Sequence, residues 1–386
     1  MFDCTIPNNT LSRAELNYES GSVRNIHYGD ILIKYGSVVD VQNDEIPFAT
    51  GKSSDDFKGA LLRDGDIIIA DTAEDETTGK ACEIGNSQGL DVVSGLHTMV
   101  CRPRNKMALG YLGYYLNSDA YHHQLLPLMQ GIKVLSLSRT NVQKTMVCYP
   151  KSKAEQQLIA DCFRNLDNLI TLHQRKYDKL TKVKKSMLEK MFPKNGANVP
   201  EIRFKGFSDA WEQRKFEEIA VRSSSICSDA NLPRVEYEDI VSGAGRLNKD
   251  ISTKESSKSG IAFHQGDVLY GKLRPYLHNW LLPAFDGLAV GDFWVLQPQN
   301  TDSSFLYRLI QSRQFDEVAN QSTGTKMPRA DWKLVSKTVF PIPSSTCEQA
   351  AIGAYFTSLD NFITLHQREL EKLKNIKKAC LEKMFV

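Results

Sequence analysis

Two short segments in the second half of the chain carry side chains suited to binding a polyanion. Each combines cations with a hydroxyl or an aromatic ring, next to a glycine or a β-rich run. The candidate side chains are Lys272, Arg274 and Tyr276 in one segment, and Thr325, Lys326 and Arg329 in the other. An arginine offers a two-donor fork to guanine edges or phosphates, whereas a lysine offers a point charge. These segments predict a nucleic-acid interface, for which a plain polar surface loop is the alternative interpretation.

The first half of the chain holds a counterpart of the second segment. Residues 131–150 align with residues 324–343 at an offset of 193, and both stretches begin with glycine followed two residues later by lysine. The candidate side chains there are Lys133, Ser136 and Arg139. Glycine permits close approach of a ligand to the backbone, and lysine or arginine meets phosphates. The recurrence of the pattern favours a binding role for both places.

Linear motifs for catalysis are missing from the chain. Residues 51–53 (GKS) resemble the end of a phosphate-binding loop, but Ile46 stands where that motif needs its first glycine. Asn248 likewise replaces the third glycine of a dinucleotide fingerprint that would begin at Gly243. There is no His-Glu-x-x-His string, and no Asn/Asp-Pro-Pro-Tyr/Phe string of the kind that grips a flipped adenine in amino-methyltransferases. We therefore expect a non-catalytic chain that holds no metal and no cofactor.

The elements that must position these segments are related by a long internal repeat. Residues 155–192 and residues 348–385 align without a gap at the same offset of 193, and 22 of the 38 positions are identical. In both copies apolar or ring residues recur at alternating intervals of four and three, which predicts a long helix with a coiled-coil seam. The seam residues are Ile159, Phe163, Leu166, Ile170, His173, Tyr177, Leu180, Met187 and Met191, and in the second copy Ile352, Phe356, Leu359, Ile363, His366, Leu370, Leu373, Cys380 and Met384. We expect the two helices to pair antiparallel.

Some polar side chains of these helices allow two interpretations. His173 and His366 stand in identical Thr-Leu-His-Gln-Arg strings, where a metal or catalytic role competes with a packed position in the seam. Asp167-Asn168 and Asp360-Asn361 could supply catalytic carboxylates, although polar residues that set the register of the helices, or partner contacts on a helix face, are favoured. Serine and glutamate three residues apart predict a capping box at each helix start, Ser152 with Glu155 and Ser345 with Glu348.

Each long helix is preceded by a block rich in short β-runs and turn signals. Residues 65–70 correspond to residues 266–271, and we further expect a strand run over 31–41 and short helices over 107–117 and 303–319. The sequence thus predicts a mixed α/β (α+β) fold with two strand-rich domains joined by two long helices in a pseudo-two-fold repeat. The expected divisions are residues 1–150 (first domain), 151–192 (central helix), 193–220 (connector), 221–343 (second domain) and 344–386 (C-terminal helix).

The composition is that of an ordinary folded protein, with 386 residues, 41% hydrophobic and 24% charged side chains, and a net charge of +2. The charge is unevenly spread, since residues 1–150 hold 13 basic against 18 acidic side chains and residues 151–192 hold ten against five. The basic face of the central helix either contacts DNA or lies in solvent beside the seam. No run of 18 apolar residues predicts a membrane span, and no signal peptide is evident. Eight scattered cysteines without a Cys-x-x-Cys pair indicate reduced thiols in a cytoplasmic protein.

Three stretches carry a family resemblance: residues 341–385, their copy from Tyr149 onward, and residues 200–219. They resemble the specificity subunits of type I restriction-modification systems, over essentially the whole chain. The resemblance implies two target recognition domains, each reading one half of a split double-stranded DNA site, with the helices fixing the separation of the half-sites. It also implies docking of two adenine-N6 methyltransferase (modification) subunits and of restriction/translocase subunits. S-adenosylmethionine, ATP and Mg²⁺ would then belong to those partners.

Two features stand apart from this resemblance. Residues 200–220 precede the second domain, whereas nothing equivalent precedes the first, so we expect a shortened first domain. The acidic first block also favours a different class of function, a coiled-coil adaptor whose globular ends bind proteins rather than DNA. The repeat symmetry and the cationic segments favour the DNA-reading interpretation, because a two-fold-like molecule suits a bipartite site on duplex DNA.

Overall fold

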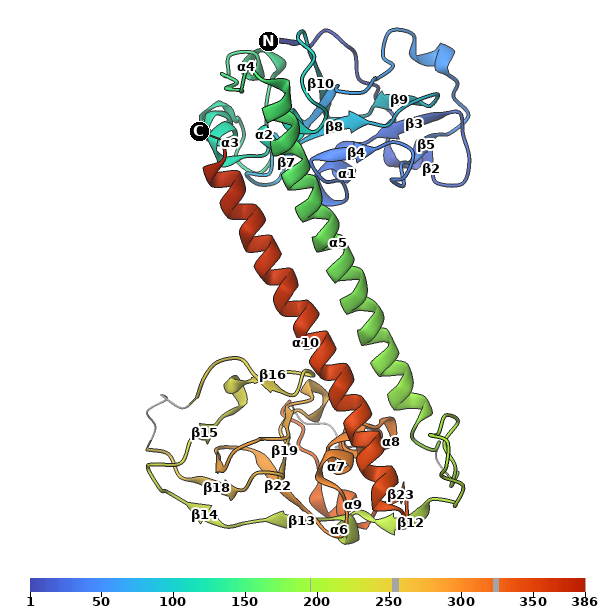
Figure 1. Ribbon diagram of the computed structural model, residues 1–386, viewed down its shortest axis with the longest axis vertical. Helices are drawn as coiled ribbons and strands as arrows, with labels where there is room; N and C mark the ends of the chain where they lie inside the picture. Colours follow the sequence, from blue (N-terminus) through green and yellow to red (C-terminus); the bar gives the residue numbers. More distant parts are fainter. Residues whose placement is uncertain (195, 252–256, 322–325, 386) are drawn as a thin grey trace. The chain divides into compact units, whose positions relative to one another are not determined.

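The chain folds into two compact units, each with its own core (Figure 1). The residues described by the computed structural model are 1–194, 196–251, 257–321 and 326–385. The first unit comprises Met1–Gln174 with Arg368–Val386, and the second comprises Arg175–Gln367. The unit boundaries therefore cut through the two long helices. Each unit contains one strand-rich block and about half of each helix.

The two long helices are present as the sequence predicts. Helix α5 runs over Lys153–Lys190 and helix α10 over Thr346–Lys383, so both begin and end two residues earlier than the repeated segments. Each is followed by a phenylalanine that enters the core, Phe192 at 6% exposure and Phe385 at 4%. No helix in the described ranges has the apolar length needed to cross a bilayer.

Within each unit the halves of α5 and α10 pack through the predicted seam. In the first unit the ring of Phe163 stacks on Phe385, with centroids 5.5 Å apart. In the second unit Met187 packs against the core that contains Phe356. The start of one helix thus lies beside the end of the other, which confirms the antiparallel pairing. One predicted seam residue is wrong, because Met384 is 39% exposed and Phe385 is buried in its place.

Two equivalent ion pairs fix the register of the helices. Asp167 Oδ1 lies 2.5 Å from Lys377 Nζ in the first unit, and Asp360 Oδ1 lies 2.6 Å from Lys184 Nζ in the second. The two aspartates are 193 residues apart, and so are the two lysines, so the pairs are copies of one interaction. The predicted register role of both aspartates is confirmed. The histidines of the two Thr-Leu-His-Gln-Arg strings are half-buried, in keeping with their seam positions.

The central sheet of the first unit is buried on both faces. Its strand order is β1-β10-β6-β8-β4, and a second sheet of order β2-β5-β3-β9 lies over one face. On β6, Ile67 and Ile69 enter the core shared with α5, whereas Ile68 and Ala70 enter the core under the second sheet. A strand that is covered on both faces has apolar residues at consecutive positions, as residues 67–70 do. The strands are β1 Phe2–Asp3, β2 Leu16–Asn17, β3 Val23–Ile26, β4 Val38–Asp40, β5 Phe48–Ala49, β6 Ile67–Ala70, β7 Thr72–Ala73, β8 Ala81–Gly85, β9 Asp91–Ser94, β10 Thr98–Pro103 and β11 Leu135–Ser136, and the short helices are α1 Tyr28–Ile33, α2 Tyr111–Tyr115, α3 Asp119–Leu125 and α4 Arg139–Val142.

The second unit repeats this plan. Its sheets have the orders β13-β22-β19-β20 and β14-β18-β21-β15. On β19, Val268 and Tyr270 enter the core shared with the long helices, and Leu269 enters the other core. The strands are β12 Glu212–Lys215, β13 Ala220–Ser223, β14 Ile226–Cys227, β15 Arg234–Val235, β16 Ile240–Val241, β17 Arg246–Leu247, β18 Gly260–Phe263, β19 Val268–Gly271, β20 Trp280–Leu281, β21 Gly287–Ala289, β22 Phe293–Pro298 and β23 Val339–Ile342, and the short helices are α6 Phe216–Ile219, α7 Ser303–Leu309, α8 Arg313–Ala319 and α9 Trp332–Lys337. The predicted mixed α/β fold with an internal repeat is confirmed.

Three local predictions are corrected by the structure. The predicted strand run over 31–41 begins instead inside helix α1, because the His27 ring caps that helix by accepting a hydrogen bond from Gly29 N at 3.2 Å. The predicted helix over 107–117 is shortened to α2, since Gly110 precedes it with φ 95°. The predicted helix over 303–319 is divided into α7 and α8.

The capping box predicted at the start of α10 is also wrong. The Glu348 carboxylate does not return to its own helix end, and instead accepts hydrogen bonds from Arg203 and Trp211. Those two residues precede β12, in the stretch that has no sequence counterpart before the first block. The carboxylate therefore joins this stretch to α10.

Candidate nucleic-acid interface

Two loops of the second unit lie side by side and hold the predicted cations. One follows β19 and the other precedes α9, and Leu273 and Arg329 join them through an isolated β-bridge. Two further main-chain hydrogen bonds of 2.7 and 2.8 Å fasten the loops together. We call residues 272–277 and 326–329 the paired-loop surface. It brings together Lys272, Arg274, Tyr276, Lys326 and Arg329, whereas Thr325 lies outside the described residues.

One carboxylate ties two of these cations to the fold. Asp292 Oδ2 accepts a hydrogen bond from Arg329 Nη2 at 2.9 Å, and its Oδ1 lies 3.4 Å from Lys272 Nζ. The hydrogen bond from Arg329 is the largest cause that keeps the pKa of Asp292 below its ordinary value. Lys272 directly follows β19 and Asp292 directly precedes β22, and we call this place the corner of the unit. Tyr237 supports it, since its hydroxyl accepts a hydrogen bond from Leu273 N at 2.9 Å and donates one to Asp292 O at 2.7 Å. Lys272 and Arg329 are thus held in fixed positions.

Arg274 is half-buried and lies in a strained backbone conformation. Its backbone is left-handed, with φ 49° and ψ 63°, a conformation that costs a non-glycine residue roughly 1–2 kcal/mol. Its Nε is buried and has no hydrogen-bond partner among the described residues. A buried donor left unpaired costs about 1–3 kcal/mol. On the same surface Tyr276 and Met327 are 52% and 54% exposed. The surface therefore combines a half-buried guanidinium with an exposed aromatic ring and an exposed thioether.

The supporting Tyr237 was not predicted, although the sequence contains a signal for it. Residues 235–240 (VEYEDI) resemble residues 26–31 (IHYGDI), and both strings follow a strand paired in parallel with its neighbour. The aspartate of each string is buried in an ion pair, Asp239 with Lys249 and Asp30 with Arg13. The two strings are offset by 209 rather than 193 residues, so the alignment of the long helices does not reveal them.

The equivalent corner of the first unit carries an acidic and a basic residue in exchanged positions. Asp71 follows β6 as Lys272 follows β19, and His97 precedes β10 as Asp292 precedes β22. The main chain is the same in both places, because Asp71 N donates to His97 O at 3.1 Å and Lys272 N donates to Asp292 O at 2.9 Å. The side chains also meet, with His97 Nδ1 3.5 Å from Asp71 Oδ1. The acidic and basic positions of this pair are exchanged between the units.

The three residues predicted in the first block have different surroundings. Ser136 lies in β11, which pairs with β7 immediately after Asp71, and Lys133 is exposed in the loop before it. Arg139 is half-buried, and its guanidinium donates to Cys4 O at 3.3 Å and to Asn8 Oδ1 at 3.1 Å. Lys133 and Ser136 are therefore available at the surface, while Arg139 holds the N-terminal segment.

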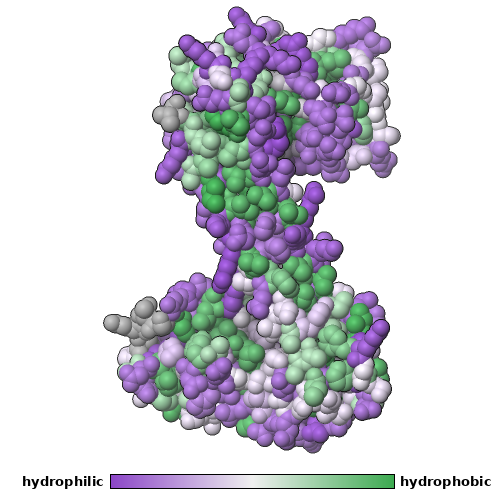
Figure 2. All heavy atoms as spheres, in the orientation of Figure 1, coloured by the Kyte–Doolittle hydropathy of each residue, from purple (hydrophilic) through white to green (hydrophobic). Residues whose placement is uncertain are grey.

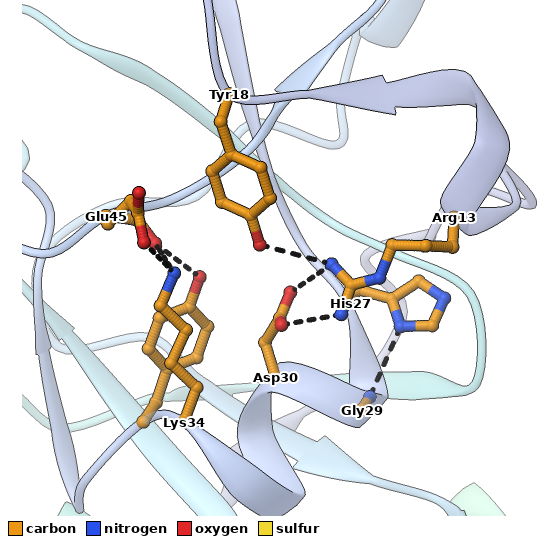
Figure 3. Close-up of polar contacts among 8 residues, drawn as sticks. Arg13, Tyr18, His27, Gly29, Asp30, Lys34 and Glu45 are labelled. Atoms are coloured by element: carbon orange, nitrogen blue, oxygen red, sulfur yellow. Dashed lines mark hydrogen bonds and ion pairs between the residues drawn. The ribbon is translucent and has the colours of Figure 1, made fainter. Parts of the chain in front are cut away.

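A cluster of paired charges in the first unit was not predicted. Figure 3 shows the Arg13 guanidinium facing the Asp30 carboxylate, with hydrogen bonds of 2.8 and 2.6 Å, and the Tyr18 hydroxyl directed toward the same guanidinium. Lys34 Nζ lies 4.7 Å from the centroid of the Tyr18 ring and 2.8 Å from a carboxylate oxygen of Glu45. The side chain of Arg13 is 48% exposed. These residues come from separate short elements, so no linear motif marks them.

Neither surface contains a cluster of metal-ligating side chains among its described residues. Across the described residues no three histidine, cysteine, aspartate or glutamate side chains are grouped closely enough to hold a metal ion. All eight cysteines are free thiols. The chemistry available is therefore that of exposed cations, hydroxyls and aromatic rings, which suits contact with nucleic-acid backbone and base edges.

Comparison with known proteins supports one family. The sequence profile described as "Type I restriction modification DNA specificity domain" matches residues 11–182 and 209–375, which includes most of both units. The chain is 23% identical over 184 residues to the type I restriction enzyme EcoDI specificity subunit of Escherichia coli, covering 45% of this chain and 41% of that protein. It is 24% identical over 252 residues to the type I restriction enzyme MjaVIII specificity subunit of Methanocaldococcus jannaschii, covering 59% and 58%. The chain thus spans about half the length of these two relatives.

A solved structure supports the fold over the full length. The crystal structure of the S subunit of a type I restriction-modification system from M. genitalium superimposes with a TM-score of 0.64 at 14% sequence identity. The match covers 100% of this chain and 94% of that chain. The two proteins share the arrangement of elements with little conservation of individual residues.

Proposed function

Because the chain belongs to the family of type I restriction-modification DNA specificity proteins, we propose that it is the DNA-reading subunit of such a system. The profile match in both repeats confirms the family resemblance found in the sequence. In the proposed function, residues 1–150 and 221–343 are target recognition domains, and each reads one half of a bipartite double-stranded DNA site. The chain itself is non-catalytic and works in the cytoplasm.

The paired-loop surface is the observation that carries this proposal. Arg274 is half-buried at this surface, and the two-donor fork of a guanidinium matches the O6 and N7 acceptors of guanine in the major groove. We assign the base contact to Arg274, and phosphate or sugar contacts to Lys326 and Tyr276. Lys272 and Arg329 share Asp292, so they present a fixed positive edge along the same surface.

In the first block we assign the DNA contact to the exposed loop before β11. Lys133 is exposed and Ser136 follows it on the pairing strand, so both can meet phosphates. Arg139 would act indirectly, by holding Cys4 and Asn8 behind that loop. The Arg13 cluster in Figure 3 supplies additional exposed cations in the same unit.

The long helices carry equivalent apolar patches suited to two copies of one partner. Leu169 and Leu172 on α5 are 43% and 46% exposed, and Phe362 and Leu365 on α10 are 54% and 51% exposed. Each pair occupies positions i and i+3, and the pairs are 193 residues apart. Figure 2 shows apolar residues at the visible surface of the helices. We propose that two methyltransferase subunits dock on these faces, because equivalent faces accept identical partners.

The proposed complex places the cofactors outside this chain. S-adenosylmethionine would be bound by the methyltransferase subunits, and ATP and Mg²⁺ by the restriction/translocase subunits. Isothermal titration of the isolated chain with S-adenosylmethionine is expected to give no saturable binding, whereas the reconstituted complex is expected to bind it.

Reconstitution with the methyltransferase subunit, followed by mapping of methylated adenines, tests the proposed function directly. The expected result is methylation at a single bipartite motif that is lost when this chain is omitted. The alternative function, a protein-binding adaptor, is favoured by the acidic run Asp71–Glu76 in the first block, which interrupts the cationic surface expected for DNA. A complex that assembles but shows no salt-dependent binding to any duplex would support the adaptor and reject DNA reading.

A further inference from the structure

A buried ion pair fastens the segment before β12 over the start of helix α10. Glu348 is 1% exposed, and its carboxylate accepts hydrogen bonds from Arg203 Nε and Nη2 at 2.7 and 2.8 Å. Trp211 Nε1 donates to the same carboxylate at 3.3 Å. Farther along the helix, the ring of Phe204 meets the ring of Tyr355 edge to face at 5.9 Å. One face of α10 is therefore covered by an arginine–tryptophan segment, residues 200–211, of the same unit.

The equivalent face of helix α5 in the first unit is exposed. At the offset of 193, Glu155, Leu158 and Cys162 correspond to Glu348, Ala351 and Tyr355. Leu158 is 72% exposed, and Glu155 and Cys162 are exposed as well. The Glu155 side chain has no hydrogen-bond or ion-pair partner among the described residues. We call these three residues the α5 face.

The α5 face has the features that receive the arginine–tryptophan segment in the second unit. A carboxylate lies in the first helical turn, and the other two residues follow on the same side, at spacings of three and seven residues. The aromatic ring that Trp211 contacts in the second unit also has a counterpart in the first unit. Phe192, which meets Trp211 edge to face at 6.0 Å in the second unit, corresponds to the buried Phe385 of the first unit. Only the covering segment differs between the two places.

We propose that the α5 face binds a segment with the chemistry of residues 203–211 that is supplied from outside residues 1–386. That segment has an arginine next to an aromatic residue, and a tryptophan eight positions after the arginine. The arginine would form a two-bond ion pair with Glu155, and the aromatic residues would cover Leu158. A second copy of this chain fits less well as the source, because its own Arg203 and Trp211 are held by Glu348. This proposal does not depend on DNA reading.

A peptide of residues 200–213 (PEIRFKGFSDAWEQ), labelled with a fluorophore, is the probe for this site. Fluorescence anisotropy with the full chain is expected to show saturable binding of one peptide per chain, because the site at Glu348 is already filled. A Glu155→Gln variant is expected to weaken binding by about tenfold or more, since a charge-assisted bidentate pair is lost. A peptide carrying Arg203→Ala is expected to lose the same factor. The Glu371→Gln variant, which alters an exposed glutamate elsewhere in the first unit, is the matched control and is expected to bind normally.

Alkylation of cysteines gives an independent readout of where the peptide binds. Cys162 belongs to the α5 face, and the exposed Cys347 serves as an internal reference in the second unit. Bound peptide is expected to slow the alkylation of Cys162 and to leave that of Cys347 unchanged. Equal affinity for the wild-type and Glu155→Gln chains, or no saturable binding at about 1 mM peptide, would overturn the proposal. Concentration-dependent dimerisation that Glu155→Gln abolishes would also overturn it, by identifying a second copy as the occupant.

Discussion

At the corner after the central strand, the second unit pairs Lys272 with Asp292, and the first unit pairs Asp71 with His97. The main-chain hydrogen bond between the two positions is the same in both units. What recurs at this corner is therefore an acidic residue beside a basic one, in either order. The order decides which charge the following loop presents, since Lys272 leads into a cationic loop and Asp71 leads into the acidic run that ends at Glu76. The same main-chain contact can thus lead into two chemically different surfaces.

The comparison also separates what each unit needs to fold from what it needs to bind. Glu348 is buried against Arg203 and Trp211, whereas its counterpart Glu155 is exposed. Glu83 is buried in strand β8 of the first unit. In the second unit the equivalent position, directly after β20, is occupied by Leu282. Differences of this kind lie inside the units, and they allow the two halves of the chain to be perturbed one at a time.

The largest contrast is expected between two glutamate variants at equivalent positions. Glu348→Ala removes one partner of a buried pair and leaves Arg203 uncompensated, which destabilises a protein by roughly 3–5 kcal/mol. Glu155→Ala removes an exposed side chain and is expected to change stability by less than about 0.5 kcal/mol. Hydrogen exchange of amides in α7 and α2, as reporters of the second and first unit, measures the two effects separately. Equal protection losses in both variants would contradict the assignment of Glu155 as unpaired.

A smaller contrast is expected for Arg274→Ala. Loss of a bidentate base contact costs about 1–3 kcal/mol and relaxes one base pair of one half-site, while the other half-site keeps its preference. Methylation mapping in the reconstituted complex measures both half-sites at once. The matched control is Arg313→Ala, an exposed arginine of α8 that pairs with Glu317 four residues later. An unchanged motif and an unchanged methylation rate would remove Arg274 from the interface.

The pH dependence of stability is expected to differ between the units because of Glu83. Burial is the largest cause that raises the pKa of Glu83 to about 7 from its ordinary 4.5, although Gly113 N donates to the carboxylate at 2.9 Å. The folded unit then keeps a proton that the unfolded chain has lost. The contribution of Glu83 to stability is therefore full below pH 4.5 and declines as the pH rises to about 7. Urea midpoints measured across this range should fall less steeply for Glu83→Gln than for the wild type. An equal pH dependence of the urea midpoint in the wild type and in Glu83→Gln would contradict the raised pKa of Glu83.

The smallest effect is expected for Lys133→Ala. A lysine on a phosphate contributes the same amount on every sequence, so all duplexes should bind slightly less tightly and the salt slope should fall by about one unit. Fluorescence anisotropy over a range of salt concentrations measures that slope. Glu74→Gln in the neighbouring acidic run is the opposing test, because removing a negative charge should strengthen binding if the first block contacts DNA. A change in sequence preference with Lys133→Ala would mean that the lysine reads a base.

Long periodic elements were predictable from the sequence because their signal is repeated many times. The heptad spacing located both helices, and it misplaced only local details such as Met384. Short elements were less predictable, since Ile31 and its neighbours have β-branched character but are drawn into α1 by the cap at His27. The nine candidate DNA-contacting residues came from local composition, which cannot show that Arg139 is engaged by the backbone of Cys4. The exchanged pair at Asp71 and His97 was not predictable from the helix alignment, because insertions give each of its positions a different offset.

The left-handed backbone at Arg274 has a consequence for how this surface can change. Glycine adopts that conformation without steric cost, so a glycine at position 274 would relax the loop while removing the guanidinium. The native arginine thus keeps the loop less stable than an available alternative. Selection for thermal robustness alone would favour glycine at this position. With the base contact proposed for Arg274, stability and recognition are opposed at position 274, and a screen for heat-resistant variants should discard recognition there before the fold is affected.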